Sequence, residues 1–169
     1  NPHAGYAGMV EYLDNQVGEM VQLLKDLDKY DNTIILFTSD NGPTYNGGTD
    51  SPWFNSGGPF HEEQGWGKGY LHEGGIRVPM IASWPAKIAP GSENSHPSTF
   101  YDVFPTLCEL AGIDPGTETD GLSFLPVMLN EEQPVADFLF WEFPSYGGQQ
   151  AVRMGKWKGI RKNIVRDNN

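Results

Sequence analysis

One acidic and one amide side chain stand where ligand sites commonly form. Asp40, Asn41 and Gly42 follow the apolar run Thr33–Thr38, which predicts a buried strand. Ligand sites in open α/β sheets collect at the carboxyl ends of strands. Two interpretations stay open at this point: the tripeptide carries functional side chains, or it is a turn, because all three residue types tolerate unusual backbone angles.

A second candidate segment, Gly67–Pro79, is basic and rich in glycine, and it leads directly into the next predicted strand. It can present Lys68 beside the Asp40-Asn41 pair. An ammonium group near an oxygen-liganded metal forms an electropositive hole for a tetrahedral anion. A lone lysine in a loop is otherwise simply solvated, so whether Lys68 is a functional residue depends on its neighbours.

Three further residues have competing interpretations. Glu73 and Arg77 are four residues apart, and we expect an internal ion pair that shapes the loop rather than direct catalysis. His72 either faces a substrate or packs locally. Cys108 is the only cysteine, which excludes an internal disulfide and a multi-cysteine zinc site. Its place on an apolar helix face predicts buried packing.

The elements that must position these residues follow an α/β pattern. Apolar residues recur every three or four positions from Tyr6 to Tyr30 and predict an amphipathic helix. A short turn leads from it into Thr33–Thr38, which we expect to be a parallel strand in a layer covered by helices. The segment from Asn41 to Gly69 is rich in Gly, Pro, Asn and Ser, and we expect a functional loop without regular structure.

A second strand is predicted at Val78–Trp84, followed by a helix. Ser98 or Thr99 caps that helix, Gly112 ends it, and Pro105 should kink or restart it near its middle. Three short strands follow and predict a small antiparallel sheet. They are expected at Asp137–Phe143, Gln149–Met154 and Lys156–Arg161, and the polar tail Asn163–Asn169 is expected to fray.

Composition argues against two classes of function. The 169 residues carry 22 acidic and 11 basic side chains, a formal net charge of −11, which disfavours binding to nucleic acid or anionic lipid. No run of apolar residues is long enough to span a membrane, and no export signal is visible.

An ordered series of motifs resembles the arylsulfatase-type sulfatases. The match begins with Tyr6–Asp14, continues through Phe37–Gly42 and Gly67–Pro79, and includes Trp84-Pro85. Later stretches resemble the C-terminal half of that family: Asp102–Leu107, Asp120-Gly121 and Ala151–Lys158. Each motif alone is weak, whereas their common order and spacing over most of the chain are specific.

The resemblance implies a fold and its division. It implies part of an alkaline-phosphatase-like α/β sandwich, with helices on a mostly parallel sheet, plus a small C-terminal antiparallel sheet. Residues 1–120 would belong to the catalytic domain and residues 121–169 would begin a small C-terminal subdomain.

The resemblance also implies a chemistry, the hydrolysis of sulfate esters by a formylglycine that attacks sulfur beside one Ca²⁺ ion. Asp40 and Asn41 would be metal ligands, Lys68 a catalytic residue that contacts the sulfate, and His72 a further substrate-binding residue. Carboxylate and amide oxygens suit Ca²⁺. Related phosphatases tend to place histidine after the aspartate, a ligand for Zn²⁺, so Asn41 favours sulfate over phosphate.

The family's Cys-x-Pro-x-Arg nucleophile motif, its Asp-Asp metal pair and further Lys and His residues are not found in this sequence. Cys108 cannot replace the modified cysteine, and His3 is too close to the first helix to be assigned to the family's upstream histidine. We therefore expect an enzyme fragment that is inactive alone and associates through its open apolar strand.

Two alternatives are a phosphatase or phosphodiesterase of the same superfamily, and a non-catalytic binding module. A carbohydrate or aryl sulfate is the expected substrate, and its recognition should lie in Thr44–Gly65 and around Trp141–Gln150. The resemblance also suggests an exported protein.

Overall fold

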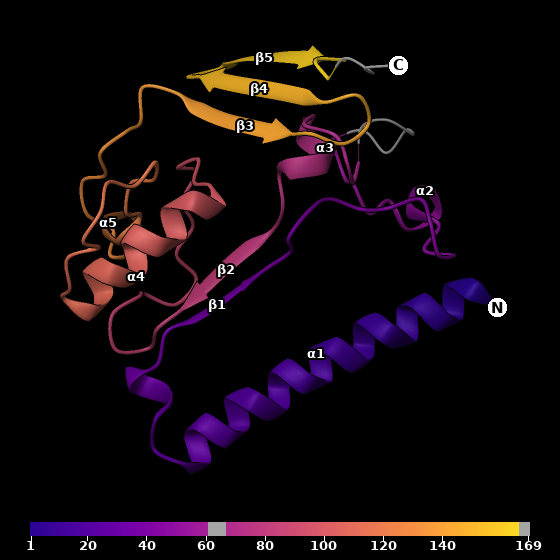
Figure 1. Cartoon of the computed structure of the whole chain (residues 1–169). Helices are drawn as coiled ribbons and strands as arrows, with labels where there is room; N and C mark the ends of the chain where they lie inside the picture. The colour runs from indigo at the N-terminus through magenta and orange to yellow at the C-terminus, as the bar shows by residue number, and fades with distance from the viewer. Residues whose placement is uncertain (61–66, 166–169) are drawn as a thin grey trace.

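The computed structural model describes residues 1–60 and 67–165 and begins with one long helix, α1 (Pro2–Asp26) (Figure 1). Helix α1 begins four residues earlier than predicted and also ends four residues earlier. It begins at Pro2 because the Asn1 side chain caps it by accepting the amide of His3 and Pro2 occupies its first turn. A 3₁₀ turn, η1 (Tyr30–Asn32), then leads into the first strand. Within the described part of the chain no residue of α1 is buried.

Strands β1 (Ile35–Thr38) and β2 (Met80–Ser83) form a two-stranded antiparallel sheet. Both predicted strands exist, but the expected parallel orientation is wrong for this pair. Thr38 lies opposite Met80 and Ile35 opposite Ser83, so residues 39–79 leave and re-enter the sheet at the same end. The strands are also less buried than expected, since each has only one described neighbour and no residue of α1 buries its apolar face against them.

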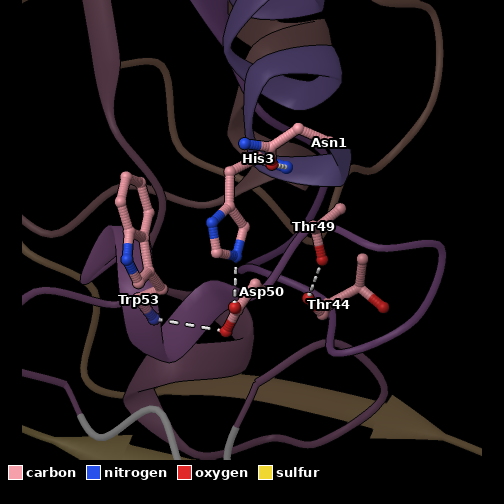
Figure 2. A network of polar contacts seen from close by, with 6 residues as sticks. All are labelled: Asn1, His3, Thr44, Thr49, Asp50 and Trp53. Atoms are coloured by element: carbon pink, nitrogen blue, oxygen red, sulfur yellow. Dashed lines mark hydrogen bonds and ion pairs between the residues drawn. The ribbon is translucent and has the colours of Figure 1, made fainter.

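The segment between the two strands contains helices α2 (Ser51–Phe54) and α3 (Glu73–Ile76). The expected loop without regular structure is therefore wrong at α2, whose N-cap, Asp50, accepts the backbone amide of Trp53. Figure 2 shows that His3, in the first turn of α1, reaches the same Asp50 carboxylate and stacks on the Trp53 ring. This network anchors the start of α1 to α2. Residues 61–66, which include the last five residues of the loop expected to determine specificity, lie outside the described residues.

A 3₁₀ turn, η2 (Phe100–Asp102), and helix α4 (Val103–Ala111) follow β2. Thr99 and Asp102 form a capping box, and Gly112 ends α4 in the left-handed region with a φ of 66°, as predicted. The sequence predicted a kink or a restart of the helix at Pro105, whereas the change from 3₁₀ to α geometry lies at Val103. Pro105 causes no kink, because it lies in the first turn of α4, where its missing N–H leaves no helical hydrogen bond unmade. Cys108 is buried, which confirms the prediction for it.

After the short helix α5 (Leu125–Met128), strands β3 (Leu139–Phe143), β4 (Gln149–Met154) and β5 (Trp157–Lys162) form an antiparallel sheet in that order. This confirms the predicted C-terminal sheet, with β4 in the middle. Figure 1 shows it lying beside α3. The division at residue 120 stays a prediction. Among the described helices, none is both long and apolar enough to cross a membrane.

Candidate functional site

The two candidate segments of the sequence meet at the end of the β1–β2 sheet. The amide of Gly42 donates a 2.9 Å hydrogen bond to the Gly75 carbonyl, and the amide of Lys68 donates one of 2.8 Å to the Pro43 carbonyl. Antiparallel pairing of β1 with β2 makes this possible, since it brings the residues after β1 next to those before β2. The turn at Asp40-Asn41 and the segment that carries Lys68 are therefore held together through their backbones.

Glycine is required where these backbones touch. A Cβ atom on Gly42 would lie 1.7 Å from the Gly74 carbonyl oxygen. A Cβ atom on Gly75 would lie 2.0 Å from the Tyr70 carbonyl oxygen and 2.5 Å from that of Gly67. Because all of these contacts are with backbone atoms, no side-chain movement can relieve them. The glycines of both motifs thus allow the two segments to approach each other.

Asp40 and Asn41 present oxygen atoms at this junction. The Ser39 hydroxyl donates to the Asn41 carbonyl at 2.8 Å, and the Asn41 amide nitrogen donates to the Gly42 carbonyl at 3.0 Å. The nitrogen end of the Asn41 amide is thereby engaged, which leaves its oxygen as the end available to a cation. Asp40 is exposed, and among residues 1–60 and 67–165 its carboxylate has no hydrogen bond or ion pair.

This donor set fits a hard cation such as Ca²⁺, which takes carboxylate and amide oxygens. It does not by itself complete a site. Within the described residues, no three His, Cys, Asp or Glu side chains are grouped closely enough to hold a metal ion. The two residues thus fit as part of a calcium site.

Lys68 is exposed, and its side chain forms no ion pair within the described part of the chain. His72 is half-buried four residues further along the same segment. Burial lowers the pKa of His72, and the charges of Lys162 and Lys158 lower it further. The imidazole is therefore held in its neutral form near pH 7. A neutral imidazole can donate one hydrogen bond to a substrate and accept another without adding charge.

Glu73 confirms one sequence expectation and adds a partner that sequence reasoning missed. Arg77 lies 3.7 Å from the Glu73 carboxylate, as the i,i+4 spacing predicted. Lys158 of β5 is closer, at 2.8 Å, and its side chain is only 15% exposed. Burial alone would raise the pKa of Glu73, but the hydrogen bond and charge of Lys158, with the charges of Arg153 and Arg77, hold it below its usual value.

Gln149 is the second residue that sequence reasoning missed. Its side chain, on β4, is 1% exposed. Its amide nitrogen donates to the Gly69 carbonyl at 2.9 Å, and its oxygen accepts the Leu71 amide at 3.4 Å. The only sequence signal was its place in a strand, two residues before the buried Ala151 and on the same face.

Comparisons with known proteins match nearly the whole chain. The Sulfatase family model matches residues 1–113, and the model described as N-sulphoglucosamine sulphohydrolase, C-terminal, matches residues 62–165. The chain is 36% identical to human arylsulfatase A over 151 residues, which are 86% of this chain and 28% of that protein. The chain therefore spans somewhat more than a quarter of the length of this relative.

Solved structures share the fold. One, described as a complex with its substrate D-glucosamine-2-N,6-O-disulfate, matches with a TM-score of 0.73 and 24% identity, over 95% of this chain and 31% of that chain. The phosphonate monoester hydrolase of Agrobacterium radiobacter matches with a TM-score of 0.68 and 24% identity, over 92% of this chain and 32% of that chain.

These likenesses confirm the expected α/β architecture, that of alkaline-phosphatase-like proteins, with the small antiparallel sheet at its C-terminal end. The family models overlap in residues 62–113, where the Lys68 segment and the α4 region lie, and together they reach from α1 to the last strand. The chain belongs to the sulfatase family.

Proposed function

We propose that this chain supplies the calcium-binding and sulfate-contacting half of a sulfuric ester hydrolase site. Asp40 and Asn41 hold the metal, and Lys68 binds a sulfate oxygen. The observation that carries this proposal is the pair of backbone hydrogen bonds, Gly42 to Gly75 and Lys68 to Pro43, which fix the oxygen ligands and the lysine at one junction. Membership of the sulfatase family supports the assignment of sulfate as the anion.

Each side chain has a role that follows from its chemistry. When bound, Ca²⁺ would counter the negative charge of the sulfate ester. The Lys68 ammonium donates hydrogen bonds to a sulfate oxygen and stabilises the charge that develops as the ester bond breaks. His72, held neutral, lies on the same segment as Lys68 and offers a hydrogen bond to the part of the substrate beyond the sulfate.

The formylglycine expected from the family resemblance has no fitting position at Cys108, which is buried in α4. No step of the reaction is therefore assigned through Cys108. What the described residues perform is binding and charge stabilisation.

The proposed substrates are sulfate esters of carbohydrates or aryl alcohols. One fold neighbour is described with a sulfated sugar as its substrate, and one relative is named an arylsulfatase. Tyr146 supports a ring-binding surface near Lys68. Its side chain is 66% exposed, stacks on Tyr70 with a centroid separation of 5.7 Å, and packs against Gly69. Aromatic faces of this kind bind sugar and aryl rings.

A phosphate or phosphonate ester hydrolase is the second candidate, because a phosphonate monoester hydrolase shares the fold. Asn41 disfavours it, since an amide oxygen suits Ca²⁺ better than Zn²⁺.

The test uses the complete protein, meaning this chain with any sequence encoded on either side of it. Rates are compared for an aryl sulfate, an aryl phosphate and an aryl phosphonate, in the unsubstituted protein and in Lys68→Ala. We expect sulfate to be the preferred substrate and Lys68→Ala to lower turnover by about 10²–10³-fold. Lys87→Ala is the matched control, because Lys87 is exposed and follows the opposite end of β2. Near-normal sulfate turnover in Lys68→Ala would contradict the proposal.

A further inference from the structure

One buried polar side chain of the C-terminal sheet contacts the Lys68 segment. Gln149 stands on the middle strand β4 and is 1% exposed, yet it carries an amide with two donors and an acceptor. Both of its described hydrogen bonds go to the backbone of the Lys68 segment. One is to the Gly69 carbonyl and one is from the Leu71 amide, so the side chain bridges both sides of Tyr70.

An apolar residue would be the ordinary choice at this position. The same face of the sheet carries the buried Leu139 and Ala151, and strand alternation favours apolar side chains there. Replacing Gln149 with an apolar residue would leave the Gly69 carbonyl and the Leu71 amide without these partners. A buried polar group left unpaired costs about 1–3 kcal/mol. The Gln149 side chain therefore supplies hydrogen bonds to loop backbone groups that lie outside helices and strands.

The backbone of this loop needs such a tether. Gly69 adopts a φ of +88°, and the backbone therefore turns immediately after Lys68. A second link from the sheet follows four residues later, where Lys158 of β5 binds Glu73 at 2.8 Å. The sheet thus holds the segment from Gly69 to Glu73 at two points, and Lys68 directly precedes the first of them.

We propose that Gln149 is a positioning residue for Lys68: it fixes the Gly69–Leu71 backbone so that the Lys68 ammonium is held at the sulfate. This inference rests on the role of Lys68 in the proposed function. It assigns the C-terminal sheet a part in the reaction, although Gln149 itself does not touch the sulfate.

The chain offers a closely matched control for the test. Gln22 is the same residue type, is exposed on α1, and donates to the Asp26 carboxylate at 2.8 Å. Gln149→Met and Gln22→Met are made in the complete protein, and kcat and KM for an aryl sulfate are measured. We expect Gln149→Met to lower kcat/KM by about ten- to hundredfold, because displacements near 1 Å have effects of that size. Gln22→Met should stay within about twofold.

A double-mutant cycle separates positioning from a general loss of structure. If Gln149 acts through Lys68, the variant Lys68→Ala/Gln149→Met has the same kcat/KM as Lys68→Ala alone. A merely structural role would make the two losses multiply, and that result would overturn the inference. So would unchanged kcat/KM in Gln149→Met while Lys68→Ala is impaired. If Lys68→Ala itself is fully active, the proposed function fails, and the inference fails with it.

Hydrogen exchange in the unsubstituted protein keeps the inference testable if Gln149→Met does not fold. We expect the Leu71 amide, which donates to Gln149, to be protected from exchange. Exchange of Leu71 as fast as that of exposed loop amides would overturn the proposed tether.

Discussion

Gly42→Ala adds one methyl group at the contact between the two halves of the site. The new Cβ atom would lie 1.7 Å from the Gly74 carbonyl oxygen and 2.7 Å from the Gly74 carbonyl carbon. To reach the 3.4 Å of an ordinary contact, the two backbones must separate by about 1.7 Å. That separation breaks the 2.9 Å hydrogen bond from Gly42 to Gly75.

Two terms set the size of the effect on stability. Overpacking of a filled site costs about 1–3 kcal/mol, and a buried amide without its partner costs about 1–3 kcal/mol. We therefore expect Gly42→Ala to lower the free energy of unfolding by about 2–6 kcal/mol. Because the same shift moves Asp40 and Asn41 away from Lys68, sulfate-ester turnover should also fall, by about a hundredfold or more.

The assay is urea unfolding of the complete protein, followed by aryl sulfate kinetics on the folded fraction. Gly18→Ala is the matched control, since Gly18 is exposed on α1 and a Cβ there meets no atom within 4 Å. Helix propensity predicts that Gly18→Ala stabilises the protein by about 0.5–1 kcal/mol. If the free energy of unfolding of Gly42→Ala lies within about 0.5 kcal/mol of that of the unsubstituted protein and the variant keeps its activity, the close approach of the two segments is wrong.

Three further predictions follow from particular contacts. The pKa of Glu73 is lowered in the folded protein, so its carboxylate contributes stability that is complete above its usual value of 4.5 and is lost as the pH falls through the lower folded value. Glu73→Gln should thus be less stable than the unsubstituted protein at pH 7, with a gap in thermal stability that closes in acid; a gap that does not depend on pH would refute this. Tyr146→Ala should raise KM for an aryl sulfate several-fold, roughly one to three times RT in binding free energy, and leave kcat nearly unchanged; unchanged KM would show that the exposed ring does not contact substrate. The 169 residues produced alone should associate, because α1 exposes apolar side chains such as Met9 (72% exposed) and Met20 (59% exposed); light scattering that finds a stable monomer at high concentration would contradict this.

Local patterns in the sequence identified most elements and pointed to the motifs of the candidate site. The strands on either side of the loop lie within their predicted ranges, and the three C-terminal strands lie within one or two residues of theirs, whereas α1 is shifted by four residues. Gly112 was recognised as a helix end because only its own backbone conformation is involved. The motifs at Asp40-Asn41 and Lys68 were likewise found from residue type and position.

Features that depend on distant segments were not predicted. An apolar run shows that Ile35–Thr38 is a strand but not which way its neighbour runs, and that direction depends on the path of residues 39–79. Gln149 and Lys158 find their partners 78 or more residues earlier in the chain, so no local pattern could connect them to the Lys68 segment. Helix α2 had a local signal, an aspartate cap with a proline in the first turn, which the high content of glycine around it obscured.

Calcium titration of the complete protein by calorimetry tests most directly whether Asp40 and Asn41 belong to the metal site. The unsubstituted protein should bind Ca²⁺, and Asp40→Ala/Asn41→Ala should lower the affinity by at least about tenfold, because a charged and a neutral oxygen ligand are both removed. Ser92→Ala/Asn94→Ala, in an exposed turn after β2, controls for substitution itself and should bind Ca²⁺ as the unsubstituted protein does. Equal calcium affinity in the Asp40→Ala/Asn41→Ala variant and the unsubstituted protein would contradict the assignment of this junction as a sulfatase site.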